Sequence, residues 1–266
     1  MSSVVKMRGA AGAAAFHADT AGTGEILAFQ DAGKVFPDGT EAVRSVSFSL
    51  RQGEFAAVIG PSGCGKSTLL RMASGLSPET SGQVVRTVEN VGYVFQDATL
   101  LPWRTVRKNV ELLGELEGLA AAVRATRAKS ALRLVGLESF ADHYPKALSG
   151  GMKMRVSLAR ALTMNPPLFL FDEPFGALDE ITRSGLNEEL LRLFVSERFA
   201  AVFITHSIGE AVYLSSRVLV MSPRPGRIVA EFDVPFDYPR SPDLRYQPEF
   251  GDLASAVSHA LREARA

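Results

Sequence analysis

The chain has 266 residues, of which 46% are hydrophobic and 22% are charged, and its formal net charge at pH 7 is zero. This composition is ordinary for a globular protein, and the charge balance gives no argument for nucleic acid as a ligand. The one cysteine, Cys64, excludes an intrachain disulfide, and no apolar run approaches the roughly 20 residues that a membrane-spanning helix requires. The length allows one large domain, or two lobes that share a core.

The N-terminal stretch, residues 1–24, is rich in Ala and Gly and has little pattern. It is too broken by Gly for a secretory signal. We expect a disordered tail here, with a short helix at residues 13–16 as the lesser alternative, and we expect the ordered chain to begin near Glu25.

Residues 26–36 and 43–50 alternate in the manner of strands, and the sequence PDGT between them supplies turn chemistry. The pattern therefore predicts two antiparallel strands. Phe36 ends the first of them, and the strand pattern alone favours a core aromatic at this position.

The stretch GPSGCGKST at residues 60–68 satisfies G-x-x-x-x-G-K-[ST], between an apolar run typical of a buried strand and a segment with helical spacing. Such a loop wraps the phosphates of a nucleotide with its backbone N–H groups at a helix N-terminus. Lys66 is placed to reach the β- and γ-phosphates and the Ser67 hydroxyl to bind Mg²⁺. A glycine-rich turn that matches by chance is the alternative, and the order of strand, loop and helix disfavours it. The predicted nucleotide-binding residues are Gly60, Pro61, Ser62, Gly63, Cys64, Gly65, Lys66, Ser67 and Thr68.

Cys64 lies inside this loop, close to Lys66 and to the predicted helix N-terminus. Their positive potential predicts a reactive thiolate. The alternative, which we favour for function, is a small residue at a tolerant position with its thiol against the sheet.

Residues 84–95 carry β-branched and aromatic side chains typical of strands, and Gln96 follows them. Apolar residues then recur at helical spacing in residues 106–119 and 120–137, which predicts a helical subdomain at about residues 97–165. Trp103, the sole tryptophan, is either a core residue or part of a groove for a partner, and the sequence does not decide between the two.

The second chemical centre is PPLFLFDEP at residues 166–174, in which Asp172 and Glu173 end a predicted buried strand. Two carboxylates at a strand end are unfavourable unless they bind a metal or a polarised water, and α/β folds place ligands at this edge. We predict that Asp172 holds Mg²⁺ and that Glu173 activates water. A plain helix cap could explain one of the acids but not both, and Pro174 argues against an immediate helix.

Residues 182–197 are typical of an amphipathic helix, and residues 200–205 of a buried strand that ends at His206. A single His after a strand more often makes a local hydrogen bond than catalyses a reaction. The last strands are predicted at residues 217–222 and 227–232, around the turn PRPG. A proline-rich segment from residue 235 precedes a terminal helix.

Taken together, these motifs resemble the ATPase subunit of an ATP-binding cassette (ABC) transporter. Their order is GPSGCGKST, Gln96, LSGGMKMR, LFLFDEP, ALD and His206, and the resemblance covers about residues 25–232. The phosphate loop alone would admit kinases, GTPases and helicases. LSGG, residues 148–151, followed by RVSLARAL and FDEP, is what makes the resemblance specific.

The resemblance implies a role for each motif, with ATP and Mg²⁺ as ligands. Lys66, Gln96, Glu173 and His206 would be catalytic, with Glu173 as the general base and His206 on the γ-phosphate. Mg²⁺ would be held by Ser67, Gln96 and Asp172. The remaining nucleotide contacts would be Phe36 on the adenine, Ser149, Gly150 and Gly151 on the γ-phosphate held by another subunit, and Asp179 at the dimer interface.

The fold implied is α/β, a P-loop NTPase with a RecA-like core, an antiparallel β subdomain and the inserted helical subdomain. The nucleotide-binding domain would span residues 25–234, followed by a proline-rich segment and C-terminal helix at residues 235–266. One chain cannot easily bring the LSGG helix to its own phosphate loop. The resemblance therefore implies a head-to-tail dimer that sandwiches two ATP molecules.

Within the family, YVFQDATLLPWRTVRKNV, LSGGM and VMSPRPGRI resemble the importer branch for nitrate, sulfonate, taurine and bicarbonate. This implies an ATP-hydrolysing motor at the cytoplasmic face of the membrane, peripheral to transmembrane permease subunits and served indirectly by a solute-binding protein. Met154 and Ser207 depart from the commoner Gln and Asp, and residues 82–92 are shorter than in many relatives.

The alternative is a soluble ABC ATPase that acts on nucleic acid or the ribosome. DNA-repair relatives insert long coiled-coil arms, but residues 69–147 show no sustained heptads. Ribosomal relatives carry two cassettes, whereas this chain has one phosphate loop. A GTPase is disfavoured because the sequence has no Asn-Lys-x-Asp motif. We therefore expect no nucleic acid partner.

Overall fold

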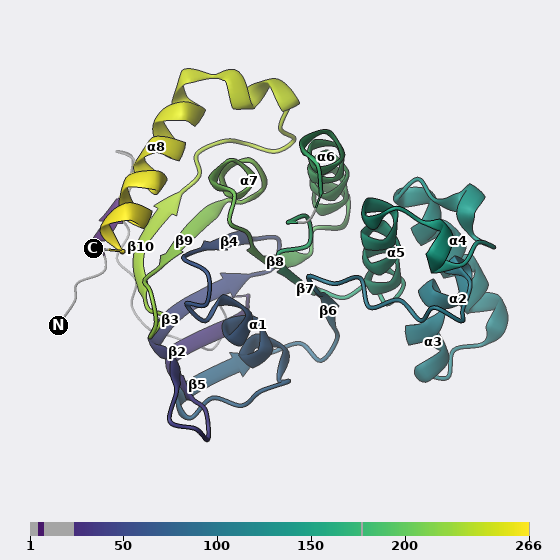
Figure 1. Cartoon of the computed structure of the whole chain (residues 1–266), viewed down its shortest axis with the longest axis horizontal. Coiled ribbons are helices and arrows are strands. Elements are labelled where there is room, and N and C mark those ends of the chain that lie inside the picture. The colour runs from purple at the N-terminus through teal and green to yellow at the C-terminus, as the bar shows by residue number, and fades with distance from the viewer. Residues whose placement is uncertain (1–4, 8–23, 177, 266) are drawn as a thin grey trace.

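The structure is a computed structural model that describes residues 5–7, 24–176 and 178–265. These residues form two sheets covered by helices (Figure 1). The seven strands of the larger sheet are, in spatial order, β1 (Val5–Met7), β10 (Ile228–Asp233), β9 (Arg217–Met221), β4 (Phe55–Ile59), β8 (Ala200–Ile204), β7 (Leu168–Asp172) and β6 (Val91–Val94). The three strands of the smaller sheet are β3 (Glu41–Arg51), β2 (Glu25–Val35) and β5 (Ser81–Arg86).

The helices fall into those that flank the sheets and those that form a separate lobe (Figure 1). The flanking helices are α1 (Lys66–Ser74), α6 (Glu180–Glu197), α7 (Ile208–Leu214) and α8 (Pro248–Glu263). The lobe lies between β6 and β7 in the chain and contains α2 (Val106–Val110), α3 (Leu112–Leu116), α4 (Ala121–Leu134) and α5 (Gly150–Leu162). Single 3₁₀ turns occur at η1 (Glu138–Phe140), η2 (Pro145–Ala147) and η3 (Pro242–Tyr246).

Strands β4, β7 and β8 are buried along their whole length. They pair in parallel, and parallel strands carry near-continuous apolar runs because both of their faces are covered. In β4, Phe55 and Ala57 pack into the cluster that includes α5, α6 and α7, whereas Ala56 and Val58 pack toward α1 and the smaller sheet. This alternation places the larger sheet between two apolar layers.

The expected strands and helices are confirmed in order, with differences where pairing or capping decides the outcome. β2 and β3 are antiparallel, as predicted. The predicted helix at residues 106–119 is divided at Glu111 into α2 and α3. Strand β1 lies inside the stretch expected to be disordered and pairs in parallel with β10. The rest of that stretch, including the alternative helix at residues 13–16, lies outside the described residues except for Gly24.

The loop before α2 is held by a buried amide. Asn109 donates from Nδ2 to the carbonyl oxygens of Leu101 and Arg104, and its Oδ1 accepts from the Leu101 N–H. This loop presents Trp103 to solvent with 71% of its surface exposed. The interpretation of Trp103 as a core residue is therefore wrong.

No helix in the described part of the chain combines the length and apolar character needed to cross a membrane.

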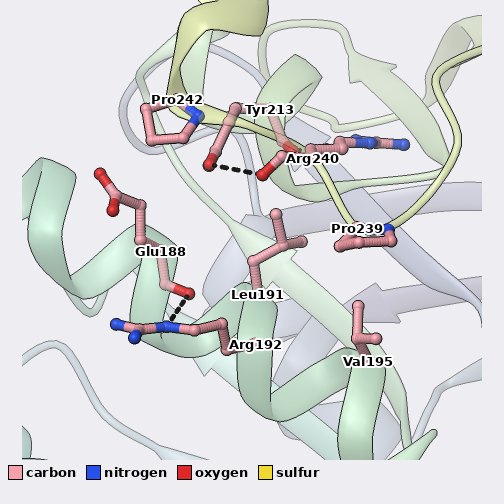
Figure 2. Close-up of a pocket in the computed structure, with 8 residues that line it drawn as sticks. All are labelled: Glu188, Leu191, Arg192, Val195, Tyr213, Pro239, Arg240 and Pro242. Carbon is pink, nitrogen blue, oxygen red and sulfur yellow. Dashed lines mark hydrogen bonds between the residues drawn. The ribbon is translucent and has the colours of Figure 1, made fainter.

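The C-terminal segment is anchored by a buried arginine at the end of α7. Arg240 donates from Nη1 to the carbonyl oxygens of Val212, Tyr213 and Ser215, at 2.9–3.1 Å. A cation at a helix C-terminus satisfies carbonyls that have no partner within the helix. Figure 2 shows the Tyr213 hydroxyl donating to the Arg240 carbonyl, beside a pocket lined by α6 and by this segment.

Replacing Arg240 with methionine should destabilise the fold. The substitution keeps much of the aliphatic stem and removes every donor, so the last carbonyls of α7 would be buried without partners. We expect a loss of about 3 kcal/mol in the free energy of unfolding, measured by urea titration. The control is Arg262→Met on the exposed face of α8, expected to stay within about 0.5 kcal/mol. Equal effects of the two substitutions would contradict the anchoring role.

Candidate functional site

The candidate site lies at the C-terminal edge of the larger sheet. Strands β4, β8 and β7 are neighbours in the sheet and run parallel, so the segments that follow them meet at one edge. The phosphate loop follows β4, His206 follows β8, and Asp172 and Glu173 end β7. Residues more than 100 positions apart in the sequence are thereby brought together.

Lys66 is the cation at the centre of this edge. The residue is only 6% exposed, and its ammonium group donates to the carbonyl oxygens of Gly60 and Pro61, each at 3.0 Å. Its Nζ also lies 3.6 Å from Glu173 Oε1. The loop closes on α1 through Gly65, whose φ of 109° is a conformation that favours glycine. Carbonyl oxygens of the loop therefore accept hydrogen bonds from its own lysine, and the N-terminus of α1 faces the site.

Asp172 faces the hydroxyl of Ser67, another residue predicted to bind Mg²⁺. The Ser67 hydroxyl donates to Asp172 Oδ1 at 2.9 Å, and the Tyr93 hydroxyl donates to Oδ2 at 3.4 Å. Burial raises the pKa of the Asp172 carboxyl above its ordinary value, while the hydrogen bond from Ser67 opposes this shift. A buried carboxylate beside a hydroxyl oxygen is a ligand set that suits Mg²⁺, because a cation would offset the unfavourable burial. The residues present therefore fit a hard divalent cation.

Tyr93 was not identified from the sequence as a site residue. It reaches Asp172 because β6 pairs with β7 in parallel, with Tyr93 opposite Leu170. Strand order across the sheet is needed to find this contact, and no local pattern reports it.

Glu173 occupies the space between Lys66 and His206. Its Oε2 lies 3.7 Å from His206 Nδ1, and its side chain is 23% exposed. The backbone φ of Glu173 is 49°, a left-handed conformation that costs energy for a residue with a side chain. Gly176 in the following turn comes so close that a Cβ there would lie 3.4 Å from His206 Cε1. A partly accessible carboxylate beside an ammonium group is an arrangement able to accept a proton from water.

The turn PRPG supports the phosphate loop from outside, a contact that the sequence did not reveal. Arg224 donates to the Gly63 carbonyl from Nε at 3.1 Å and from Nη2 at 2.9 Å. Gly226 packs directly beneath Cys64, and a Cβ at this position would overlap the Cys64 carbonyl oxygen. The backbone of the loop is therefore fixed by a turn more than 150 residues away in the sequence.

The predicted reactivity of Cys64 is wrong. Its side chain is 1% exposed, and burial raises the pKa of the thiol even though Lys66 nearby opposes the shift. The alternative interpretation, a small thiol packed inside the fold, agrees with the structure.

The remaining predicted residues are not brought together with this cluster. Gln96 is exposed beyond the end of β6, and Phe36 is half-buried with the Lys34 ammonium 5.8 Å from its ring. Among the described residues, no hydrogen bond or ion pair links residues 149–151 to the phosphate loop. Ser149 instead caps α5, its hydroxyl oxygen accepting from the Met152 N–H at 3.3 Å. The helix thus begins inside the LSGG motif, one residue after Ser149.

Two further cap residues lie next to the site. Asp179 caps α6 by accepting from the Thr182 N–H at 3.0 Å, and these hydrogen bonds lower the pKa of Asp179. Ser207 caps α7 by accepting from the Glu210 N–H at 3.3 Å. Ser and Asp are both good helix caps, so Ser207 can serve where Asp is commoner.

Comparison with known proteins gives one consistent result. A family model described as ABC transporter matches residues 43–176. The taurine import ATP-binding protein TauB of Rhizobium johnstonii is 43% identical over 239 residues, covering 84% of this chain and 91% of that protein. The aliphatic sulfonates import ATP-binding protein SsuB of Bacillus cereus is 41% identical, covering 76% of this chain and 82% of that protein.

Solved structures agree with these sequence relatives. A dimeric ATP-binding cassette in a post-hydrolysis state, bound to ADP and Pi, superposes with a TM-score of 0.71 at 30% identity. The match covers 80% of this chain and 100% of that structure. A component of an ABC transporter complex from Clostridium perfringens gives a TM-score of 0.73 at 26% identity, covering 80% of this chain and 90% of that structure.

Gly226→Ala should weaken binding at the phosphate loop. The added methyl group would overlap backbone atoms of Cys64, which cannot move without displacing the loop. We expect a loss of about 1–3 kcal/mol, measured as weaker binding of a fluorescent ATP analogue together with a lower melting temperature. Gly251→Ala in α8 is the matched control, because nothing lies within 4 Å of its added Cβ. Unchanged binding by Gly226→Ala would show that this turn does not fix the loop.

Proposed function

The chain belongs to the ABC transporter family, and from this premise we propose that it is the ATP-hydrolysing subunit of an importer. The observation that carries the proposal is the cluster at the end of β4 and β7, where Lys66, Asp172 and Glu173 lie beside the phosphate loop. A nucleoside triphosphate would place negatively charged oxygens beside Lys66, and the cation bound to it would place positive charge beside the two carboxylates.

ATP would bind with its phosphates against the N–H groups of the loop and the N-terminus of α1. Ser67 and Asp172 would hold Mg²⁺, and we assign Gln96, which is exposed just beyond the end of β6, as the third ligand. The ion would neutralise charge on the phosphates. Phe36, which directly follows β2 and is half-buried, would stack on the adenine.

Glu173 would accept the proton of the attacking water. Its carboxylate is partly accessible and is held near Lys66, which would reach the β- and γ-phosphates. His206, 3.7 Å from Glu173, would contact the γ-phosphate. The strained backbone of Glu173 is consistent with a residue held in place for chemistry.

A second copy of the chain would complete the site. Ser149, Gly150 and Gly151 form the start of α5, a thirteen-residue helix whose first N–H groups make an anion site. They lie in the helical lobe, away from the phosphate loop of their own chain (Figure 1). A head-to-tail dimer would bring them to the ATP bound by the partner, with Asp179 at the interface.

The transport partner would be a permease that docks beside Gln96. Trp103 is 71% exposed and Phe95 is 36% exposed, both in the segment around Gln96. Exposed aromatics of this kind mark partner sites. The names of the taurine and aliphatic sulfonates import relatives support taurine, a sulfonate or a similar small solute as the cargo. Nitrate would be the third candidate, and the chain would lie at the cytoplasmic face of the membrane, peripheral to the permease.

Glu173→Gln should retain ATP binding and lose most turnover. The amide keeps the shape of the side chain but cannot accept the proton of water, so we expect a fall in kcat of about 100-fold or more. ATP-bound dimer should accumulate and be visible by size-exclusion chromatography. Glu249→Gln on the exposed face of α8 serves as the control and should hydrolyse ATP normally. Near-normal steady-state turnover by purified Glu173→Gln would refute the assignment of the base.

Mixing two inactive variants tests whether the site is shared between chains. Lys66→Ala removes the phosphate loop cation, and Ser149→Arg obstructs the start of α5. Each heterodimer should regenerate one intact composite site, so ATPase activity should exceed that of either parent. Heterodimers that form without any gain in activity would count against a shared site that can work alone.

A further inference from the structure

An arginine on α6 joins two turns that the proposed mechanism treats separately. The first turn, described at residues 173–176, 178 and 179, carries Glu173 and leads to Asp179. The second turn, residues 205–207, carries His206. Arg183 lies between them with its side chain 20% exposed, one turn inside α6.

Arg183 holds the first turn by its backbone. Its guanidinium donates from Nε to the Phe175 carbonyl at 3.3 Å and from Nη2 to the Leu178 carbonyl. The turn is compact, because the Gly176 N–H donates to Glu173 and the Leu178 N–H donates to Phe175. A guanidinium fork that binds two carbonyls of one compact turn fixes the orientation of that turn as a unit.

The same guanidinium faces a buried carboxylate that holds the second turn. Arg183 Nε lies 3.8 Å from Glu210 Oε1, and the Glu210 side chain is 7% exposed. The Thr205 hydroxyl donates to Glu210 Oε2 and accepts from the Ser207 N–H at 3.0 Å. Glu210 therefore acts through Thr205 on the backbone that flanks His206.

A buried carboxylate is unfavourable without a cation close by. Around Glu210 the hydrogen-bond donors are the neutral Thr205 hydroxyl and the Asn187 amide at 3.5 Å. Among the described residues, Arg183 is the cation within ion-pair distance of Glu210. The attraction between Arg183 and Glu210 therefore offsets the burial of the carboxylate. A shift of either turn changes the distance between the two charged groups.

We propose that Arg183 and Glu210 form a positioning bridge within one chain. The bridge couples the first turn, which leads to Asp179, to the second turn, which carries His206. The inference rests on the proposed function, in which Asp179 faces the second copy and His206 faces the γ-phosphate. Movement of the first turn on dimer closure is transmitted to His206 through the bridge. Neither Arg183 nor Glu210 contacts the phosphate loop, so the bridge sets the rate of hydrolysis and not the affinity for nucleotide.

The test is a double-mutant cycle of Arg183→Gln and Glu210→Gln. Each variant should lower kcat by about 10–100-fold, because small displacements of catalytic groups have effects of this size. The dissociation constant of a fluorescent ATP analogue should stay within about two-fold of wild type. The double variant should be no slower than the slower single variant, because both substitutions break one bridge. A purely structural role would instead lower stability, binding and turnover together.

Two further variants sharpen the test. Arg183→Lys keeps the positive charge but loses the planar fork, so its kcat should fall between those of wild type and Arg183→Gln. This variant keeps the proposal testable if Glu210→Gln does not fold. Arg192→Gln is the matched control on the same helix, because Arg192 is exposed and its Nε donates only to the Glu188 carbonyl of its own helix.

The outcomes separate the bridge from the proposed function. If the wild-type chain hydrolyses ATP and Arg183→Gln has the same kcat, the bridge is overturned and the proposed function stands. The same conclusion follows if the effects of the two single substitutions multiply in the double variant. A wild-type chain that binds ATP but hydrolyses none, even with its permease, would overturn both.

Discussion

Burial of opposite charges at one edge of the larger sheet is the constraint on which the rest of the structure depends. Lys66 and Asp172 are 6% and 8% exposed, and burying either charge alone would be strongly unfavourable. The fold compensates with two loop carbonyls on the lysine and two hydroxyls on the aspartate. This compensation requires β4, β7 and β6 to end at the same edge of the sheet. The parallel order of these strands therefore matters more for assembling the site than the length of any one strand.

Arginines that donate to backbone carbonyls hold the loops around this edge. Arg224 fixes the phosphate loop and Arg183 the turn after β7, whereas Arg240 holds the end of α7 near the start of β4, at the opposite edge of the sheet. Arg160 of α5 donates to the carbonyls of Ala98 and Thr99, which follow Gln96. The planar fork of arginine can bind two carbonyls of one turn, which a lysine cannot reproduce with the same geometry. Arg160 and Arg183 thus position loops from helices, whereas Arg224 positions the phosphate loop from the turn between β9 and β10.

Local chemistry made much of the fold predictable. The strands at residues 55–59, 168–172 and 200–204 are largely apolar runs bounded by turn residues, and the Ser67–Asp172 contact joins two motifs that follow or end parallel strands separated by β8. Contacts between distant segments were not predictable: β1 beside β10, Tyr93 on Asp172 and Arg224 on Gly63 leave no periodic signal. The prediction of a reactive Cys64 thiolate was wrong because burial outweighs the nearby positive charge, in agreement with the alternative of a thiol against the sheet.

The structure of one chain also explains why the proposed site depends on a second copy. The start of α5 is capped by Ser149 within the helical lobe, while Lys66 and Glu173 lie at the sheet edge. Arg160, near the other end of α5, grips the loop after Gln96. A partner that binds beside Gln96 would therefore act on α5, and in the proposed dimer α5 would present its N-terminus to the ATP of the other chain. The proposed permease contact and the proposed composite site would thus lie at the two ends of one helix, and coupling between them would require only that α5 move as a rigid body.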